Sequence, residues 1–583
     1  MDMINLKING IAVSVPKGST ILEAARIAGV EIPTLCFMKE KNEIGACRIC
    51  VVEANEGRGF RIVTACVYPV TEGMEVLTNT AKIQKARKTT LELILSTHEK
   101  KCLSCKRSTN CELQKLCRDY GVDESAFEGF KPKYEIDYST PHLVRDNNKC
   151  ILCRRCVAAC NEQFVGVIGA NDRGIDTSIG QAFNMSLSQV PCISCGQCTV
   201  VCPTGALTEK DDTDKIWAAL ADPTKKVIVQ TAPSVRATLG ECFGMAPGTN
   251  VEGKMVAALR RLGFHKVFDT DFSADVTIVE EANELVQRIQ NKGVLPMITS
   301  CSPGWVKFCE MYYPDLISHL SSCKSPQQMA GAIIKTYWAE KNGVEAKDIV
   351  NVSVMPCTAK KFEIGRDDQS AAGVPDVDIA ITTRELGRMI ERAGLDFVNL
   401  PDEEFDNPLG EDTGAAVIFG ATGGVMEAAL RTANDWLTGK DNTEIEFTAV
   451  RGTAGLKQAS VNINGSEIKV CVASGAAAAK VVMDKLASGN PDGWAFIEIM
   501  GCPGGCVNGG GQPIQPQYVR DTIDLKAVRA KVLYDQDASM AIRKSHESPV
   551  VKELYSNWYD GYGCEKAHHA LHTSYVKRDK FSK

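Results

Sequence analysis

Two stretches decide how the middle of the chain folds: residues 150–160 read CILCRRCVAAC, and residues 192–203 read CISCGQCTVVCP. Each run spaces its cysteines by two, two and three residues, so the second run repeats the first. The whole chain holds 25 cysteines in 583 residues. The first fifteen residues do not resemble a signal peptide, so we expect a cytoplasmic protein with reduced, metal-binding thiols; disulfides are the alternative.

The repeated runs match the pattern of a two-cluster bacterial ferredoxin, in which the fourth cysteine of each run binds the other cluster. Paired zinc sites are the alternative, but they do not need this exchange of ligands. We therefore predict two [4Fe-4S] cubes. The first would be held by Cys150, Cys153, Cys156 and Cys202, and the second by Cys192, Cys195, Cys198 and Cys160.

The N-terminus predicts a small sheet that carries one helix. Apolar residues alternate on both sides of Asn9-Gly10, which indicates a β-hairpin, and Thr20 to Glu23 has the form of a helix-capping box. Four cysteines of this region suit a [2Fe-2S] cluster, although the spacing also allows zinc. They are Cys36, Cys47, Cys50 and Cys66.

A third group lies in a stretch that we expect to be mostly helical, residues 79–130. Its cysteines are Cys102, Cys105 and Cys111, which leave one position of a tetrahedral site open. His98 lies four residues before Cys102 and is the predicted fourth ligand, with nearby Cys117 as the competitor.

From about residue 225, short apolar strands alternate with amphipathic helices, which predicts an α/β domain. Three strands run directly into cysteine loops: residues 299–305 (TSCSPGW), 355–361 (MPCTAKK) and 500–506 (MGCPGGC). Open α/β sheets bind ligands beyond the carboxyl ends of their strands, so these loops could converge. The strands are expected at Lys226–Gln230, Val294–Ile298, Ile349–Met355 and Ala495–Met500.

These three loops resemble the signature segments of the iron–iron hydrogenase family, and the resemblance covers nearly the whole chain. It implies a multidomain α+β and α/β protein. The expected units are a β-grasp [2Fe-2S] domain (1–78), a small helical [4Fe-4S] domain with one His and three Cys ligands (79–130), a two-cluster ferredoxin domain (140–212), a two-lobed α/β hydrogenase domain (220–540) and a C-terminal segment packed on it (541–583). The first two units also resemble the N-terminal part of the large iron–sulfur subunit of respiratory complex I.

The resemblance also implies an H-cluster, which is a [4Fe-4S] cluster joined to a two-iron centre that carries CO, cyanide and a bridging dithiolate amine. Cys357, Cys502 and Cys506 would hold the cluster, with Cys506 as the bridge. Lys360 would donate a hydrogen bond to a cyanide. By the same resemblance, the residues expected to line the two-iron centre are Ala232, Pro233, Ser234, Gln327, Met355, Gly420 and Met500.

Cys301-Ser302 departs from the family, because many members have two consecutive cysteines there, one as a cluster ligand and one as a proton relay. We expect Cys301 to be the fourth cluster ligand and Ser302 a relay, since a hydroxyl can pass a proton. The alternative is Cys301 as the relay and Ser302 as an oxygen ligand.

Protons also need a path to the site. Glu281 and Glu284 share one face of a helix expected from Asp275 to Ile289, and they match the family's relay glutamates, as Ser321 matches its relay serine. From the residues alone, a solvated acidic face is the favoured interpretation of the pair.

Two other features are read as structural. The glycine-rich stretch at residues 420–424 lacks the P-loop lysine, so we expect a tight turn near the cluster and no phosphate site. The remaining cysteines are expected to be small buried hydrophobes. They are Cys242, Cys309, Cys323, Cys471 and Cys564.

The sequence thus predicts a hydrogenase for 2 H⁺ + 2 e⁻ ⇌ H₂, with one [2Fe-2S] cluster, three accessory [4Fe-4S] clusters and one H-cluster. The net charge of −6 argues against nucleic acid, and no apolar run is long enough to span a membrane. The expected partners are ferredoxin and/or a flavin-containing NADH-linked subunit, with a stand-alone ferredoxin enzyme or a formate dehydrogenase complex as alternatives. The alternative from a different functional class is a non-catalytic electron-transfer subunit or an iron–sulfur assembly protein.

Overall fold

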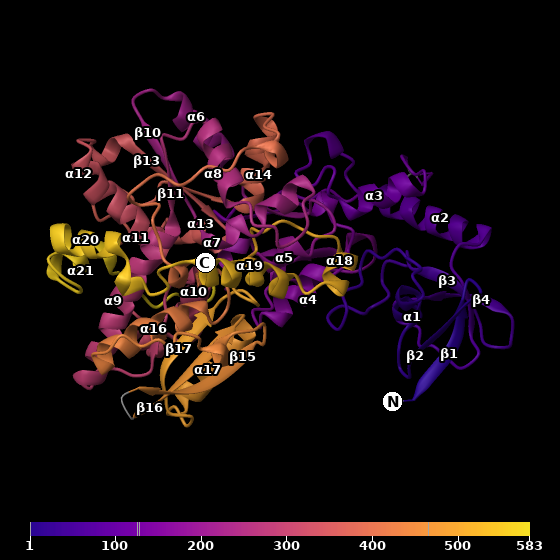
Figure 1. Cartoon of the computed structure of the whole chain (residues 1–583). Helices are drawn as coiled ribbons and strands as arrows, with labels where there is room; N and C mark the ends of the chain where they lie inside the picture. The colour runs from indigo at the N-terminus through magenta and orange to yellow at the C-terminus, as the bar shows by residue number, and fades with distance from the viewer. Residues whose placement is uncertain (1, 125, 128, 464–465, 583) are drawn as a thin grey trace.

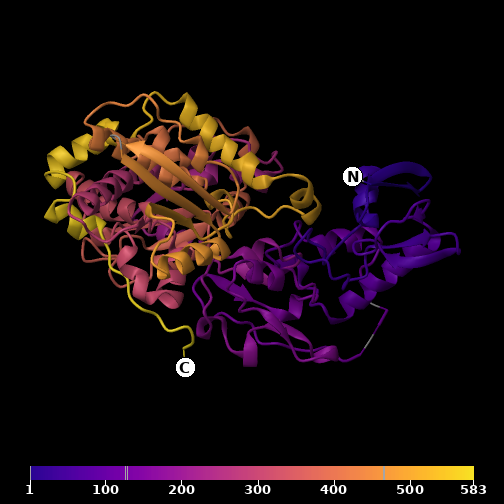
Figure 2. The same cartoon turned by 90° about the horizontal axis from the view of Figure 1, so that it is seen from below.

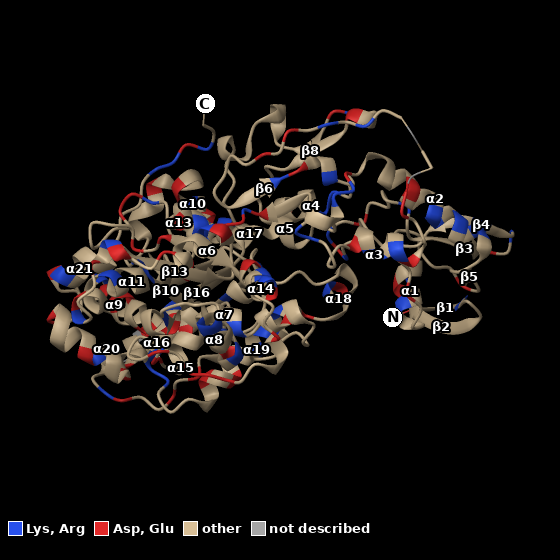
Figure 3. Cartoon of the chain, turned by 90° about the horizontal axis from the view of Figure 1, so that it is seen from above, with Lys and Arg blue, Asp and Glu red and all other residues tan. Residues whose placement is uncertain are grey.

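The computed structural model describes residues 2–124, 126–127, 129–463 and 466–582. Figure 1 shows the N-terminal sheet at one end of an elongated molecule and the two sheets of the C-terminal part at the other. The second view places the middle of the chain between these two ends (Figure 2). Basic and acidic residues are interspersed along both ends (Figure 3). No helix among the described residues combines the length and apolarity needed to cross a membrane.

The N-terminal sheet is built around the predicted hairpin. Strand β1 (Met3–Ile8) pairs antiparallel with β2 (Ile11–Pro16), and Asn9 and Gly10 both have positive φ, as a two-residue hairpin turn requires. The sheet order is β2-β1-β5-β3-β4, with β3 (Val51–Asn55), β4 (Phe60–Thr64) and β5 (Glu75–Leu77). Helix α1 (Ile21–Ile27) begins at the predicted capping box on Thr20.

The next region contains two helices, α2 (Ala81–Thr97) and α3 (Glu112–Asp119), so about half of the expected helical stretch is loop. The repeated cysteine runs follow. Each run enters a short helix, α4 (Arg155–Glu162) or α5 (Gln197–Val200), after a residue with positive φ, Arg154 or Gly196. The internal sequence repeat is thus also a repeat of backbone conformation. A short antiparallel pair of strands, β6 (Leu143–Arg145) and β9 (Leu207–Glu209), flanks the two runs.

The C-terminal part holds two sheets. The first is parallel, with the order β11-β10-β13-β14: β11 (Lys266–Asp269), β10 (Lys226–Thr231), β13 (Ile349–Met355) and β14 (Ile379–Thr382). The second has the order β12-β17-β16-β15, with only the last pair antiparallel: β12 (Met297–Ile298), β17 (Trp494–Met500), β16 (Ser466–Ser474) and β15 (Leu456–Ile463). The strand predicted at Val294–Ile298 forms only at Met297–Ile298, so its predicted start is wrong. Strand β13 has the predicted bounds.

Helix α9 (Thr270–Gln290) lies in the core between the two sheets. It begins five residues before the predicted Asp275 because the Asp269 side chain accepts a hydrogen bond from the Asp271 N–H and caps it. Its Phe272 packs in one hydrophobic cluster and its Ile278 in another, so one helix joins two cores.

The remaining helices surround these sheets. Their bounds are α6 (Thr213–Ala221), α7 (Pro233–Arg236), α8 (Glu252–Arg261), α10 (Pro303–Tyr312), α11 (Pro326–Ile333), α12 (Ala339–Lys341), α13 (Ala359–Glu363), α14 (Thr383–Arg392), α15 (Gly414–Val417), α16 (Gly424–Thr438), α17 (Ala476–Ala487), α18 (Gln517–Thr522), α19 (Leu525–Ser539), α20 (Pro549–Leu554) and α21 (Glu565–Leu571). Leu571 of α21 joins the core cluster that contains Phe272, so the tail packs on the sheets, as predicted.

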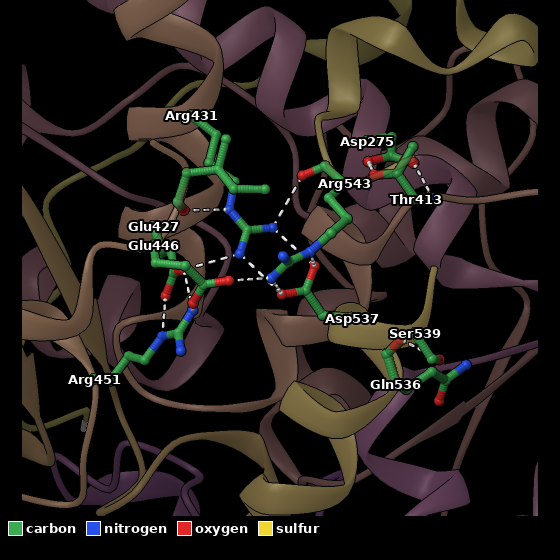
Figure 4. Close-up of polar contacts among 11 residues, drawn as sticks. Asp275, Thr413, Glu427, Arg431, Glu446, Arg451, Gln536, Asp537, Ser539 and Arg543 are labelled. Carbon is green, nitrogen blue, oxygen red and sulfur yellow. Dashed lines mark hydrogen bonds and ion pairs between the residues drawn. The ribbon is translucent and has the colours of Figure 1, made fainter. Parts of the chain in front are cut away.

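A buried ionic network ties α16 to α19 (Figure 4). The Arg431 guanidinium donates to Glu427 at 2.8 Å and to both carboxyl oxygens of Asp537 at 2.9 Å. Arg543 donates to Asp537 as well, and Arg451 donates to Glu427. Arg431 has no exposed side-chain surface, so its two carboxylate partners depend on it for charge balance.

Arg431→Ala should therefore lower the free energy of unfolding by about 3–5 kcal/mol, because it leaves two buried carboxylates without their main cation. The shift is measurable as a lower midpoint in thermal or urea unfolding of the full chain. Lys480→Ala is the matched control. It breaks an exposed ion pair with Asp484 and should cost about 0.5 kcal/mol. Equal shifts in the two variants would contradict this account.

Candidate active site

Strand ends from both sheets converge on one cavity of about 80 Å³. The first sheet contributes the loops after β10 and β13, and the second contributes those after β12 and β17. All three cysteine loops border the cavity, as the sequence predicted for carboxyl ends of strands. The predicted residues on its wall are Ala232, Pro233, Ser234, Cys301, Ser302, Gln327, Met355, Cys357, Lys360, Gly420, Met500, Cys502 and Cys506.

Sequence reasoning missed another part of the wall. Thr270, Asp271 and Ala274, from the first turns of α9, line the cavity, as does Phe419. The apolar strand β11 could have predicted these residues, because it ends at Asp269 and α9 begins at the next residue. A strand of only four residues is a weak pattern in the sequence.

Burial dominates the chemistry of the cavity thiols. It raises the pKa of Cys502 and Cys506, and the neighbouring thiol of Cys357 raises both further. A buried thiolate is therefore unfavourable here unless a cation compensates it, and a thiol that binds a metal is deprotonated. This donor set fits an iron–sulfur cluster.

Cys301 and Ser302 meet different groups. Burial raises the pKa of the Cys301 thiol, and the nearby charges of Glu281 and then Cys506 raise it further. The Ser302 hydroxyl instead accepts a hydrogen bond from the Gly501 N–H at 3.0 Å, in the loop that carries Cys502. The two consecutive side chains thus lie between Glu281 on one side and the Cys502 loop on the other.

Lys360 is a fixed ammonium at the cavity wall. Its Nζ donates to the Ser325 hydroxyl and the Glu363 carboxylate, both at 2.8 Å, and to the Cys301 carbonyl at 3.2 Å. Glu363 also accepts a hydrogen bond from Gln327 at 2.9 Å. These contacts hold a positive charge beside the cysteine loops.

The glycine-rich stretch at residues 420–424 is a turn, as predicted. The carboxylate of Glu498 binds the backbone N–H groups that could otherwise bind a phosphate there. Gly423, with φ 93°, precedes α16, and the Glu498 carboxylate accepts hydrogen bonds from the N–H groups of Gly423 at 2.6 Å and Met426 at 2.7 Å. Glu498 thus takes the place at the helix N-terminus that a phosphate would need.

The predicted acidic pair lies beside this cavity. Glu281 is fully buried, which makes the reading as a solvated face wrong for this residue. Burial, and then the charge of Glu284, raise its pKa to about 8, while the hydroxyl of Ser321 lowers it. Ser321 Oγ also donates to Glu284 at 2.9 Å, whereas neither carboxyl oxygen of Glu281 has a hydrogen-bond partner among the described residues. The three predicted relay groups thus lie in one row, which is joined by a hydrogen bond at its Ser321–Glu284 end.

The structure brings the ferredoxin cysteines together in the predicted sets. Burial raises the pKa of Cys150, Cys153 and Cys156, the thiol of Cys202 raises all three further, and these four line one small cavity. In the second set, burial raises the pKa of Cys160 and Cys198; Cys192 raises both further, and Cys160 also raises that of Cys198.

The N-terminal cysteines also gather. Cys50 and Cys66 lie 3.3 Å apart between sulfurs, and a hydrogen bond from Cys36 lowers the pKa of Cys47 to about 6. All 25 cysteines are free thiols. Of the five cysteines expected to be small buried hydrophobes, Cys242 and Cys564 are only half-buried, so that expectation is wrong for these two.

His98 is buried, its Nδ1 has no hydrogen-bond partner among the described residues, and burial lowers its pKa to about 4. A neutral imidazole with a free nitrogen suits a metal ligand. The competitor Cys117 packs in a hydrophobic cluster with Leu91 and Leu95. Its pKa is raised by burial and then by Cys111 and Cys102, so it also lies near the ligand thiols.

Short contacts connect the groups of thiols in series. Asn42 Nδ2 donates to the carbonyls of Cys36 at 2.7 Å and Cys153 at 3.0 Å. Cys111 Sγ lies 3.5 Å from the carbonyl of Pro203, which follows Cys202. Cys502 Sγ lies 4.0 Å from the carbonyl of Cys195. The two N-terminal groups therefore both reach the first ferredoxin set, and the second set reaches the cavity.

Comparisons with known proteins agree with this order. Five family models match: a 2Fe-2S iron-sulfur cluster binding domain (1–81), the NADH-ubiquinone oxidoreductase-G iron-sulfur binding region (87–126), a 4Fe-4S dicluster domain (149–208), the iron only hydrogenase large subunit, C-terminal domain (225–510) and the iron hydrogenase small subunit (523–578).

Similar proteins span the whole chain. The NADP-reducing hydrogenase subunit HndD of Solidesulfovibrio fructosivorans is 47% identical over 100% of both chains. Iron hydrogenase 1 of Clostridium pasteurianum is 44% identical over 99% of this chain and 100% of its own. A solved structure of apo [FeFe]-hydrogenase HydA1 from Chlamydomonas reinhardtii is 40% identical, covers 64% of this chain and 100% of its own, and has a TM-score of 0.56.

The raised pKa of Glu281 makes a testable prediction about stability. Between the ordinary glutamate pKa of about 4.3 and about 8, the folded chain keeps a proton that the unfolded chain has lost, so stability falls as pH rises. Glu281→Gln, which is always neutral, should therefore unfold at a higher temperature than the unaltered chain at about pH 9, and the gain should shrink as the pH falls and vanish below about pH 4.

The measurement uses protein made without the two-iron centre, so that the metal does not dominate the titration. Glu75→Gln, at an exposed position at the start of β5, should match the unaltered chain at both pH values. A pH-independent difference for Glu281→Gln would contradict the assignment.

Proposed function

Because the chain belongs to the iron–iron hydrogenase family, we propose that it catalyses 2 H⁺ + 2 e⁻ ⇌ H₂ at the cavity between its two sheets. The observation that carries the proposal is the convergence of Cys357, Cys502 and Cys506 with Lys360 on one cavity. When bound there, an H-cluster would supply the site at which H₂ forms or splits. The polypeptide would hold it, exclude water and deliver protons and electrons.

Electrons would reach the cavity through clusters held by the other thiol groups: one [2Fe-2S] cluster and three [4Fe-4S] clusters. The contacts of Asn42 and Cys111 support two entry points that meet at the first ferredoxin cube. The contact of Cys502 with Cys195 supports delivery from the second cube. Cys102 and Leu103 are exposed, so the cluster proposed on His98 and three cysteines would lie where a partner can approach.

We reverse our first assignment of Cys301 and Ser302. The proximity of Cys301 to Glu281 favours its thiol as the proton relay, and the Ser302 contact with Gly501 favours its hydroxyl as the fourth cluster ligand. The proposed proton route then runs from Cys301 through Glu281 and Ser321 to Glu284. A row of groups that both donate and accept protons can pass them without free water.

The proposed partner is a flavin-containing subunit that exchanges electrons with NADH or NADPH, together with ferredoxin, in a cytoplasmic complex. The support is the match of residues 87–126 to an NADH-ubiquinone oxidoreductase region and the identity to a subunit named NADP-reducing. A stand-alone ferredoxin enzyme is the alternative, and purification of the native complex under anaerobic conditions separates the two.

An anaerobic infrared spectrum of the matured protein tests the proposed function. Sharp CO and cyanide bands that shift under H₂ are expected. Their absence from protein with intact iron–sulfur clusters, made with the maturation enzymes, would leave a non-catalytic electron-transfer subunit.

The roles of Cys301 and Ser302 give a second prediction. Cys301→Ala, which leaves no group that can pass a proton, should slow H₂ production about 10²-fold or more while the iron content and infrared bands persist, because only the relay is impaired. Ser302→Ala should lose the cavity cluster, and Ser302→Cys should keep it.

Iron analysis and electron paramagnetic resonance (EPR) spectra of the three variants distinguish the assignments. Loss of the cavity cluster in Cys301→Ala, with its retention in Ser302→Ala, would restore the first assignment.

A further inference from the structure

Glu284, at the outer end of the proposed relay row, has two groups beyond it. On one side, Arg288 donates to its Oε1 through Nη2 at 2.6 Å and Nε at 3.1 Å. On the other side, Ser322 donates to Oε2 through its N–H at 3.0 Å and its hydroxyl at 3.3 Å. A guanidinium stays protonated at any working pH and cannot take up a proton, so the protein groups that can continue the row lie on the second side. The Glu284 side chain is itself about 16% exposed, so direct exchange with solvent is the competing outlet.

The C-terminal tail places an imidazole on that second side. His572 Nδ1 lies 2.8 Å from the Ser322 hydroxyl, and Nε2 lies 3.2 Å from the Glu280 carboxylate. The backbone fixes this position: Thr573 N–H donates to the Ser322 carbonyl, and Lys324 N–H donates to that of Leu571, both at 2.8 Å. About 7% of the His572 side chain is exposed, so its edge reaches solvent.

We propose that His572 carries protons between Glu284 and solvent, as an outlet of the relay row supplied by the C-terminal tail. This inference rests on the proposed function. In one step, a proton on Glu284 Oε2 moves to the Ser322 hydroxyl while the hydroxyl's own proton moves to His572 Nδ1. Glu284 is left as a carboxylate and His572 as an imidazolium, so one proton is transferred and none is lost. The imidazolium then releases a proton to solvent, and uptake follows the reverse order.

The surroundings suit this role. The carboxylate of Glu280, on α9, faces the imidazole of His572 and also accepts a hydrogen bond from Tyr555 at 2.5 Å. The Glu284 carboxylate and the Cys323 thiol lie within 4.8 Å of the imidazole. The ring of His568 on α21 stacks on that of His572 at 4.5 Å and is itself exposed. The flanking carboxylates compensate an imidazolium, and an imidazole exchanges protons near neutral pH.

The test compares three variants of the matured protein. His572→Gln keeps a polar side chain that cannot carry a proton, and Ser322→Ala removes the bridging hydroxyl with little change in packing. His569→Gln, an exposed neighbour on α21, is the control. We measure H₂ production against pH, the solvent isotope effect and rescue by added imidazole, and we record the infrared bands of every sample.

The expected result is about a tenfold lower rate in His572→Gln and Ser322→Ala, a larger solvent isotope effect, partial rescue of His572→Gln by imidazole, and no change in His569→Gln. Rates and isotope effects equal to those of the unaltered enzyme would overturn the outlet, as would an equal loss in the control. A slower His572→Gln without imidazole rescue, together with an unaffected Ser322→Ala, would mean a structural role and would also overturn it. Absence of CO and cyanide bands from the unaltered protein would instead reject the proposed function.

Discussion

The low dielectric at the junction of the two sheets acts on every ionisable group around the cavity. It raises the pKa of the thiols of Cys502 and Cys506 and of the carboxyls of Glu281 and Glu498. For the thiols, this makes the charged form dependent on a bound cation. For Glu281, it moves the pKa to about 8, where a carboxyl can both hold and release a proton at neutral pH. One physical condition thus suits both the proposed cluster ligands and the proposed proton carrier.

The fold maintains this condition by filling the polar positions around the cavity with its own groups. Glu498 occupies the N-terminus of α16, and Lys360 is held by Ser325 and Glu363. Farther out, Arg431 neutralises Glu427 and Asp537, and so joins α16 to α19. Each contact satisfies a buried polar group without admitting solvent.

Local sequence patterns predicted a large part of this structure. The hairpin at Asn9-Gly10, the cap at Thr20, the strand from Ile349 to Met355 and the exchange of fourth cysteines between ferredoxin runs all follow from spacing or turn chemistry. The seven residues predicted to line a two-iron centre all border the cavity, as does Lys360, but their roles toward the metal stay predictions.

Other features depend on contacts that no local pattern records. Asp271 lines the cavity because α9 starts earlier than its apolar periodicity indicates. Glu498 caps a helix some seventy residues before it, and His572 meets Ser322 from the far end of the chain. Cys301 and Ser302 are neighbours on one loop but meet different partners, which spacing cannot show, and the opposite roles proposed for them rest on these contacts.

The central claim is that the second ferredoxin cube delivers electrons directly to the cavity cluster, across the contact between Cys195 and Cys502. EPR of the fully reduced protein tests it most directly, by comparing the unaltered chain with a Cys195→Ser variant that weakens the second cube. The account predicts that the cavity cluster's spectrum is broadened by spin coupling to the cube in the unaltered chain, and that this broadening is lost in the variant. A cavity-cluster spectrum that is identical in the two proteins would contradict it.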